Sequence, residues 1–244
     1  MEFYIFLIVF TISIIQSIAG VGILVLGTPI MLIFKFTIFE TMFFLLPISI
    51  ISSFFNLMLI NFFSNHKIQI DFKLIKYFFI FCFPSVCIGL IIIKNYSELI
   101  NFNILVSVVI FFSIILKIKY KKIFVNLKKR SKKIITLLIG LIHGLTNSGG
   151  TLLSLFILNK EKKKIDISRF QIHLFYFLLA FSQLVILYFL QDYDLSFHIN
   201  IIFILVIIII SSLIGNKIAS MYKDLVSYIV YALAILASLI LIFK

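Results

Sequence analysis

The stretch Gly140–Leu158, with the sequence GLIHGLTNSGGTLLSLFIL, decides how this chain folds. It is apolar at both ends, but its middle collects glycines and small polar residues. These weaken a continuous helix and bring polar groups that hydrocarbon cannot satisfy, so we expect the helix to break there. A break over glycines leaves free backbone N–H groups at the start of the next half-helix, which is the positive end of its dipole and binds anions.

A second stretch, in the first apolar segment, has the same character. Ser17–Gly22 reads SIAGVG and lies 127 positions before its counterpart when Gly22 is aligned with Gly149, an alignment that also pairs Gln16 with His143. Small residues in a membrane helix more often form a packing surface for a neighbour, and that reading stays open for either cluster alone. Two interrupted segments at corresponding positions of two halves are the sequence feature that best indicates a transporter's binding site.

The composition identifies an integral membrane protein. Of 244 residues 63% are hydrophobic, the mean hydropathy is +1.23, and apolar runs of about twenty residues recur along the chain, as bilayer-spanning helices require. The net charge of +13 arises in short connections, where Lys and Arg set membrane orientation, so we expect no nucleic-acid partner. The two cysteines, Cys82 and Cys87, are expected to be free, and we expect no metal site and no cofactor.

The apolar runs form two sets of four, each with one glycine-rich interruption. The predicted runs are about 3–34 (interrupted at 20–29), 40–62, 74–93 and 101–116, then 134–158, 170–190, 199–215 and 225–243. A shift of 127 residues carries the first set onto the second. We therefore predict an all-α integral membrane protein of two repeats, residues 1–117 and 134–244, joined by a basic cytoplasmic linker at 118–133.

The basic residues favour re-entrant hairpins over full crossings at the two interruptions. If both interrupted segments cross the bilayer, the 22 Lys and Arg residues divide 13 to 9 between its sides; if both return to their own side, they divide 19 to 3. Because short cytoplasmic loops are rich in Lys and Arg, we predict six spans and two hairpins, with the basic loops cytoplasmic. Three spans plus a hairpin make an odd number of crossings, which inverts one repeat relative to the other. For residues 3–19, charge counting leaves both a span and a hairpin arm open.

The two interruptions supply the residues expected to bind an anionic substrate. Several N–H and hydroxyl donors with little full positive charge would bind an anion and still release it. The candidates are His143, Thr146, Asn147, Ser148, Gly149, Gly150 and Thr151 in the second interruption, and Gln16, Ser17, Gly20 and Gly22 in the first. Asn147 leads because an amide at membrane depth needs a partner, and capping the following half-helix is an equally open role for it. His143 is either a functional titratable residue or a neutral histidine hydrogen-bonded across a helix interface.

Polar residues in the following spans are weaker candidates. His173, Tyr176 and Gln183 share one predicted span, and Asn56 lies at the position that matches Gln183; such residues often only join helices. Arg169, at the start of the same span, either attracts anions from the cytoplasm or extends to the membrane interface. Asp and Glu are predicted only at the ends of spans, which disfavours a carboxylate proton relay.

The segments IAGVGILVLGTP (residues 18–29) and GLIHGLTNSGGTLLSLF (140–156) resemble the paired glycine-rich motifs of the sulfite exporter TauE/SafE family, the TSUP permeases. The likeness covers essentially the whole chain, including the basic central loop and the stretch GNKIASMYKD (215–224). It implies a multi-pass permease of the bacterial cytoplasmic membrane that moves small anions such as sulfite, sulfonates or related organosulfur compounds.

Three other classes compete with an anion permease. A carrier of a cation or another small solute on the same scaffold would be expected to place carboxylates near the half-helix ends, and the spans hold none at depth. A membrane enzyme could use pairs such as His143–Ser148 or His173–Tyr176, but no elbow motif, metal-ligand set or cofactor signature accompanies them, so we expect no enzyme. A structural subunit gives no reason for duplicated interruptions.

Overall fold

The computed structural model describes residues 2–64, 70, 72–119, 129–158, 165–190 and 201–244, and all regular structure in these ranges is helical. The elements are α1 (Glu2–Ala19), α2 (Ile23–Ile33), α3 (Ile38–Phe63), α4 (Phe72–Tyr77), a π-helical turn η1 (Phe78–Cys82), α5 (Phe83–Tyr96), α6 (Phe102–Lys119), α7 (Lys129–Thr146), α8 (Gly150–Leu158), α9 (Ile165–Leu190) and α10 (Ile201–Ile242). The predicted all-α class is confirmed.

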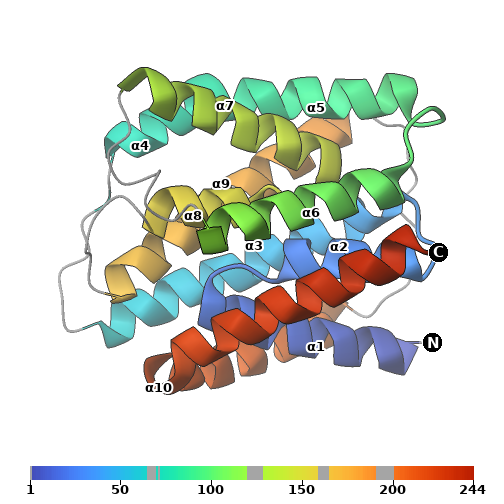
Figure 1. Cartoon of the computed structure of the whole chain (residues 1–244). Helices are drawn as coiled ribbons and strands as arrows, with labels where there is room; N and C mark the ends of the chain where they lie inside the picture. Colours follow the sequence, from blue (N-terminus) through green and yellow to red (C-terminus); the bar gives the residue numbers. More distant parts are fainter. Residues whose placement is uncertain (1, 65–69, 71, 120–128, 159–164, 191–200) are drawn as a thin grey trace.

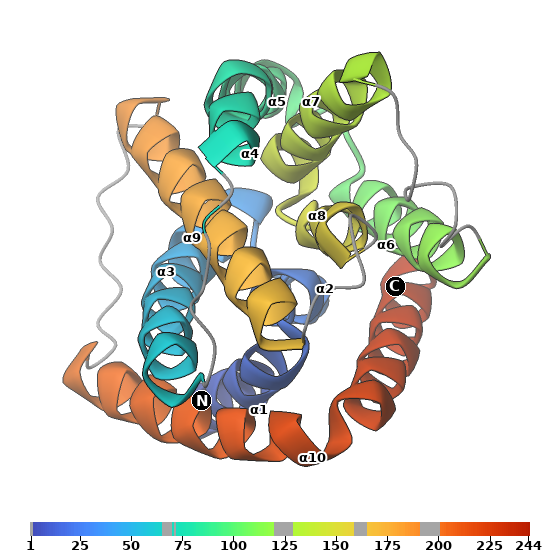
Figure 2. The same cartoon turned by 90° about the vertical axis from the view of Figure 1, so that its left-hand side faces the viewer.

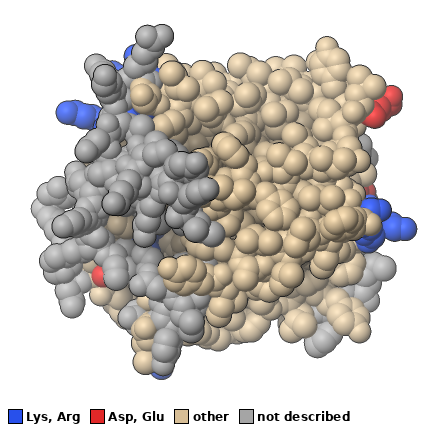
Figure 3. All heavy atoms as spheres, viewed as in Figure 1, with Lys and Arg blue, Asp and Glu red and all other residues tan. Residues whose placement is uncertain are grey.

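Four helical stretches are long and apolar enough to cross a bilayer. They are Ile38–Phe63, Phe72–Tyr96, Asp166–Leu190 and Ile202–Ala219, accompanied by shorter apolar helices. α6 exposes Val108, Phe112 and Ile115 at helical spacing, and in Figure 3 the charged residues lie at the two ends of the molecule with a wide uncharged band between them. Water-soluble proteins rarely expose apolar surface on this scale, whereas lipid solvates it. The chain is a multi-pass membrane protein.

Both predicted interruptions are breaks between helices. The chain turns between α1 and α2 at Gly20, where φ is +78°, and between α7 and α8 at Asn147, where φ is +58°. A residue in the left-handed region ends a right-handed helix, because it turns the chain away from the helical path. Figure 1 shows that α2 runs back toward the end of the molecule where α1 starts, and α8 toward the end where α7 starts.

The first break is shorter than predicted. It occupies residues 20–22, and the helix α2 then includes Pro29, which was expected to lie in the interruption. A helix with an internal proline loses one hydrogen bond. Tertiary packing compensates for this loss, because the side chains from Ile23 to Pro29 are all buried against neighbouring helices.

The two ends of the bundle bring together different segments. At one end, which we call the basic end, α3 stops, α4, α7 and α9 start, and Ser64, Asp166 and Lys217 line a common cavity (Figure 1). At the opposite end Lys94 of α5 donates a hydrogen bond to the carbonyl of Leu190, the last residue of α9.

The two breaks lie 127 residues apart. This shift carries the end of α1 onto the end of α7 and the start of α2 onto the start of α8, and α3 and α9 are helical over corresponding residues. The loop predicted at 216–224 is wrong, because α10 is one continuous helix from Ile201 to Ile242. Residues 216–224 contain neither proline nor glycine, so nothing in them stops a helix. α10 bends between two straight arms instead, as Figure 2 shows.

The segment predicted as a linker, 118–133, is helical at both of its ends. α6 continues to Lys119 and α7 begins at Lys129, while residues 120–128 lie outside the described part of the chain. Lys and Arg are good helix formers, so a run of charge does not by itself end a helix.

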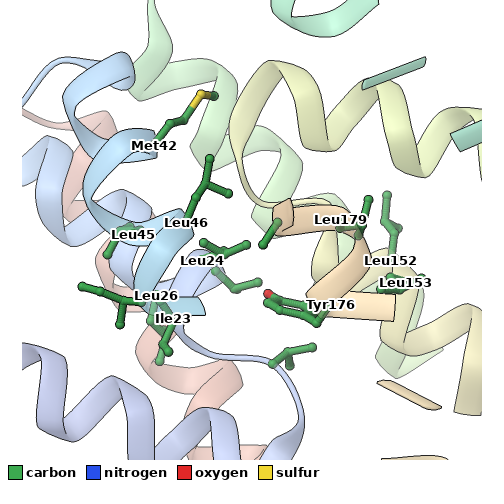
Figure 4. Close-up of a cluster of buried hydrophobic side chains, with 14 of the residues drawn as sticks. Ile23, Leu24, Leu26, Met42, Leu45, Leu46, Leu152, Leu153, Tyr176 and Leu179 are labelled. Atoms are coloured by element: carbon green, nitrogen blue, oxygen red, sulfur yellow. The ribbon is translucent and has the colours of Figure 1, made fainter. Parts of the chain in front are cut away.

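α2 and α8 lie in the middle of the bundle, and α3 and α9 pack against each other beside them (Figure 2). α1 lies along α10 on one side, and α7 lies along α5 on the other. The approach of α7 to η1, the turn that precedes α5, requires glycine, since a Cβ on Gly140 would lie 2.3 Å from the carbonyl oxygen of Cys82. α2, α3, α8 and α9 meet in a buried apolar cluster around Tyr176 (Figure 4).

Candidate functional site

The second break, residues 147–149, is held by hydrogen bonds between side-chain hydroxyls and backbone groups close in the sequence. The Thr146 hydroxyl donates to the carbonyl of Ile142 at 2.7 Å and accepts from the N–H of Ser148 at 3.2 Å. The hydroxyls of Ser148 and Thr151 donate to the carbonyls of Thr146, at 3.1 Å, and Ser148, at 3.3 Å. These predicted ligands are buried, and their hydroxyl protons are committed to backbone carbonyls.

Backbone donors remain at the start of α8. In the described part of the chain, no hydrogen bond leads from the N–H groups of Gly149, Gly150, Thr151 and Leu152. The first N–H groups of any helix lack partners within it, and they carry the positive end of the helix dipole. Because the start of α8 is buried, its N–H groups need a hydrogen-bond acceptor from outside the helix.

Asn147 connects the second break to α2. Its Nδ2 donates to Oγ1 of Thr28 at 3.1 Å, and its Oδ1 has no hydrogen-bond partner among the described residues. The amide therefore does not cap α8, which was the other role considered for it. Thr28 lies in an apolar helix far away in the sequence, and only the tertiary fold brings it to this break.

Gln16 caps the second helix of the first broken pair. Its Oε1 accepts from the N–H of Ile23, the first residue of α2, at 3.1 Å, and its Nε2 donates to Ser53 of α3 at 3.1 Å. The Ser17 hydroxyl is also paired, donating to the carbonyl of Ser13 at 2.9 Å. The polar side chains of the first break thus have partners within the protein, unlike several at the second.

We expect Gln16→Leu to lower the free energy of unfolding by about 1–3 kcal/mol, because it leaves the buried N–H of Ile23 and the hydroxyl of Ser53 unpaired. The thermal unfolding temperature of the purified protein in detergent measures the effect. Thr11→Val on the same helix is the matched control, since the exposed Thr11 hydroxyl bonds only to the carbonyl of Leu7. Equal unfolding temperatures for the two variants would contradict the capping role.

Both breaks lie against one face of α9. A Cβ on Gly20 would lie 2.8 Å from Ile172, and one on Gly150 would lie 2.1 Å from the ring of Tyr176, one helical turn further along. Tyr176 is fully buried, and its hydroxyl, which has no partner among the described residues, points toward Leu24 at the start of α2 (Figure 4). A buried hydroxyl without a partner requires an explanation, and ligand binding is one.

His143 is buried beside the second break. Neither ring nitrogen has a hydrogen-bond partner within the described chain, so the ring is not bonded across a helix interface there. A Cβ on Gly149 would lie 2.7 Å from the Cβ of His143, so the glycine lets the break fold closely onto the preceding turn. Gln183 of α9 donates to the His143 carbonyl at 3.5 Å and to the sulfur of Met42 at 3.3 Å, and its Oε1 has no partner among the described residues.

The predicted site residues therefore fall into two groups. The second break gathers unpartnered polar atoms of His143 and Asn147, together with those of Tyr176 and Gln183 from α9. The first break is internally satisfied and joins the second through Thr28. The side chains of His143, Asn147 and Ser148 are completely buried, so the second break is enclosed in this structure.

Arg169 turns inward, which rules out the interfacial alternative. Its side chain is 4% exposed, and its Nη2 donates to the carbonyl of Ser17 at 2.6 Å and to Oδ1 of Asn216 at 2.7 Å. Arg169, His173 and Tyr176 lie on one face of α9, but this spacing left both alternatives for Arg169 open. Asn216 gave no signal in the sequence, because its segment was expected to be a loop.

Nearly the whole chain matches one known family. The model of the sulfite exporter TauE/SafE family matches residues 5–241. The chain belongs to the sulfite exporter TauE/SafE family. TauE/SafE is a transporter family, and the membership predicted from the two glycine-rich motifs is confirmed. No curated protein and no solved structure matches the chain.

Proposed function

We propose that this TauE/SafE protein is a secondary transporter that moves a small sulfur oxyanion, such as sulfite or an organic sulfonate, across the cytoplasmic membrane of a bacterium. The second break carries the proposal, because it combines a buried helix start with polar side chains that lack partners among the described residues. An anion that accepts hydrogen bonds from the N–H groups of Gly150 and Thr151 would satisfy them without meeting a full positive charge. Such binding permits release.

Side chains around the second break complete the proposed binding shell. The Tyr176 hydroxyl is a donor beside Gly150, and a neutral His143 ring supplies one N–H donor. The Tyr176 ring also covers the start of α8, so entry of an anion requires this ring to move. Met42 and the aliphatic residues around the ring exclude water, which strengthens hydrogen bonds to a bound anion.

We propose that the two repeats, residues 1–117 and 134–244, are inverted relative to each other and joined by 118–133. The two breaks lie 127 residues apart, and one contact recurs with them: Gly22 packs on Gln16 as Gly149 packs on His143. From the breaks, α2 and α8 run toward opposite ends of the bundle (Figure 1). Inverted repeats whose broken helices meet inside the membrane support alternating access by movement of one repeat against the other.

Anion efflux from liposomes tests this function. Purified protein reconstituted into liposomes loaded with sulfite or methanesulfonate should release them faster than protein-free liposomes do. Chloride-loaded and sulfate-loaded liposomes show whether the transport is selective. If neither sulfur compound leaves faster while a cation or a neutral solute does, the alternative of another carrier on this scaffold replaces the proposal.

The proposed orientation predicts where an introduced cysteine is labelled. In a variant without Cys82 and Cys87, Lys163→Cys should react with a membrane-impermeant maleimide only when the cytoplasmic face is accessible, because the basic loops are retained inside. Asn101→Cys, at the exposed start of α6, is the matched site and should react from outside. Labelling of both sites from one side would contradict the two-hairpin topology.

A further inference from the structure

A second polar site lies at the basic end, away from the second break. A cavity of about 550 Å³ lies between the end of α3, the start of α9 and the middle of α10. Its lining includes Leu59, Ser64, Asp166, Arg169, Asn216 and Lys217. We call it the Arg169 cavity. Among the described residues of its lining, Arg169, Lys217 and Asp166 carry charge, two positive against one negative.

Arg169 is buried in this lining, and no described residue forms a hydrogen bond with it as a counter-charge. Both of its hydrogen bonds in the described chain go to uncharged oxygens, those of Ser17 and Asn216, and its Nε has no partner there. A guanidinium cannot lose its proton in a protein, so its charge persists in this environment. Asp166 attracts the guanidinium but forms no hydrogen bond with it, and an anion entering the cavity would supply a hydrogen-bonded counter-charge.

A network of amides orients the guanidinium. Asn216 accepts from Arg169 and donates through Nδ2 to Oδ1 of Asn56 at 2.7 Å. Asn56 in turn donates to the Ser17 hydroxyl at 3.0 Å. Ser17 lies one turn before Gly20, so the network connects the cavity to the first break. The cavity therefore adjoins the helices of the proposed transport site.

The corresponding positions at the opposite end carry no charge. The 127-residue shift places Met42 where Arg169 stands, Gly89 at the position of Asn216, and Leu90 at that of Lys217. Met42 and Leu90 are completely buried in the apolar core. The two ends of the bundle thus differ in charge, although their helices correspond.

We propose that Arg169 binds the substrate anion in a vestibule at the basic end, before the anion reaches the second break or after it leaves. This inference rests on the proposed function and adds a second anion site to it. The chemical class is a small oxyanion whose oxygens accept hydrogen bonds from a guanidinium, in a geometry that favours Arg over Lys. The competing role for Arg169 is to tether α9 to α1 and α10 without binding anything.

Charge-selective labelling separates these roles without relying on transport. The full-length protein with Cys82 and Cys87 replaced by Ala receives Leu59→Cys in the cavity wall, and its reaction with an anionic and a cationic methanethiosulfonate is compared. Arg169→Gln should lower the anionic-to-cationic rate ratio roughly tenfold, whereas Arg169→Lys should keep it. Lys217→Gln, which removes an exposed cation in the same lining, is the matched control and should change the ratio less than about twofold. An unchanged ratio in folded Arg169→Gln would overturn the proposal.

Protection by the anion keeps the test decisive if Arg169→Gln does not fold. Methanesulfonate at millimolar concentration, an oxyanion that does not react with the reagent, should slow labelling of the Leu59→Cys variant by the cationic reagent at constant ionic strength, and chloride should not. Protection should be weaker when Arg169→Lys is added, because lysine cannot bind an oxyanion through two parallel N–H donors. Equal labelling rates with and without methanesulfonate would overturn the vestibule.

Transport kinetics distinguish this inference from the proposed function. With anion supplied from the basic end, Arg169→Lys should raise the KM for sulfite several-fold and leave the maximal rate near that of the wild type. An unchanged KM, together with no methanesulfonate protection of the thiol in the Leu59→Cys variant, would remove the vestibule and leave the proposed function standing. Methanesulfonate protection of that thiol in a protein that transports neither sulfite nor methanesulfonate would remove the proposed function and keep the anion site.

Discussion

Gly150→Ala is expected to reduce sulfite efflux nearly to the level of protein-free liposomes and to lower the thermal stability of the protein. A Cβ at this position would lie 2.1 to 2.4 Å from three atoms of the Tyr176 side chain, closer than carbon atoms approach in folded proteins. The ring is fully buried among the side chains of α2 and α8, so it cannot swing aside without opening the core (Figure 4). Overpacking of this kind costs about 3 kcal/mol, the upper part of the usual range.

Gly27→Ala is the matched control for this prediction. It also adds one methyl to a glycine in the shorter helix of a broken pair, but the new Cβ would meet the mobile ends of Leu45 at 2.9 and 3.0 Å. Its stability should stay close to that of the wild type, since replacing a helical glycine by alanine gains up to about 1 kcal/mol.

Removing the ring should rescue Gly150→Ala. The double variant with Tyr176→Leu should be more stable than Gly150→Ala alone, even though Tyr176→Leu by itself leaves a cavity, because residues in contact have non-additive effects. Wild-type stability and efflux in Gly150→Ala would show that the break does not depend on close packing against α9.

Asn147→Leu is expected to slow sulfite efflux at least about tenfold. Leucine in the left-handed region costs about 1–2 kcal/mol, since it has no local hydrogen bond to offset the steric strain there. The change also removes the donor to Thr28 and leaves that buried hydroxyl unpaired. An increase of about 1.4 kcal/mol in the activation free energy of transport already lowers its rate tenfold.

Two further variants separate the shape of the break from its amide. Asn147→Gly keeps the left-handed turn without strain but removes both polar atoms, so any loss of efflux reports the amide itself. Thr28→Val removes only the acceptor of the Asn147 hydrogen bond. Wild-type efflux in Asn147→Gly would mean that the amide does not serve the substrate, and wild-type efflux in Asn147→Leu would exclude the second break as the site.

The breaks were predictable because their signal is local. Glycines and small polar residues have no stable place in a lipid-facing helix, so Ser148 and Gly149 indicated an interruption from composition alone. The membrane class follows from hydropathy for the same reason. The continuous α10 was not predictable from composition, because the Lys, Tyr and Asp residues of 216–224 occur in loops as well as in helices.

The partners of the site residues were not predictable, since they come from helices distant in the chain. The sequence indicated both Gln16 and Asn147 as anion ligands, with Asn147 first, but it could not show their partners. The fold pairs both polar atoms of Gln16 and leaves Oδ1 of Asn147 unpaired among the described residues. The same holds for Arg169, for which interfacial and inward positions are both compatible with the start of a span.

The sequence by itself determined that this chain crosses a membrane, where its helices break, and which family it resembles, because these depend on local composition and on the period of apolar residues. Only the tertiary structure decided which polar groups remain unpaired, that Tyr176 covers the start of α8, and that Arg169 faces a cavity. The reason is physical: whether a buried donor or acceptor is satisfied depends on atoms that the fold brings from elsewhere in the chain.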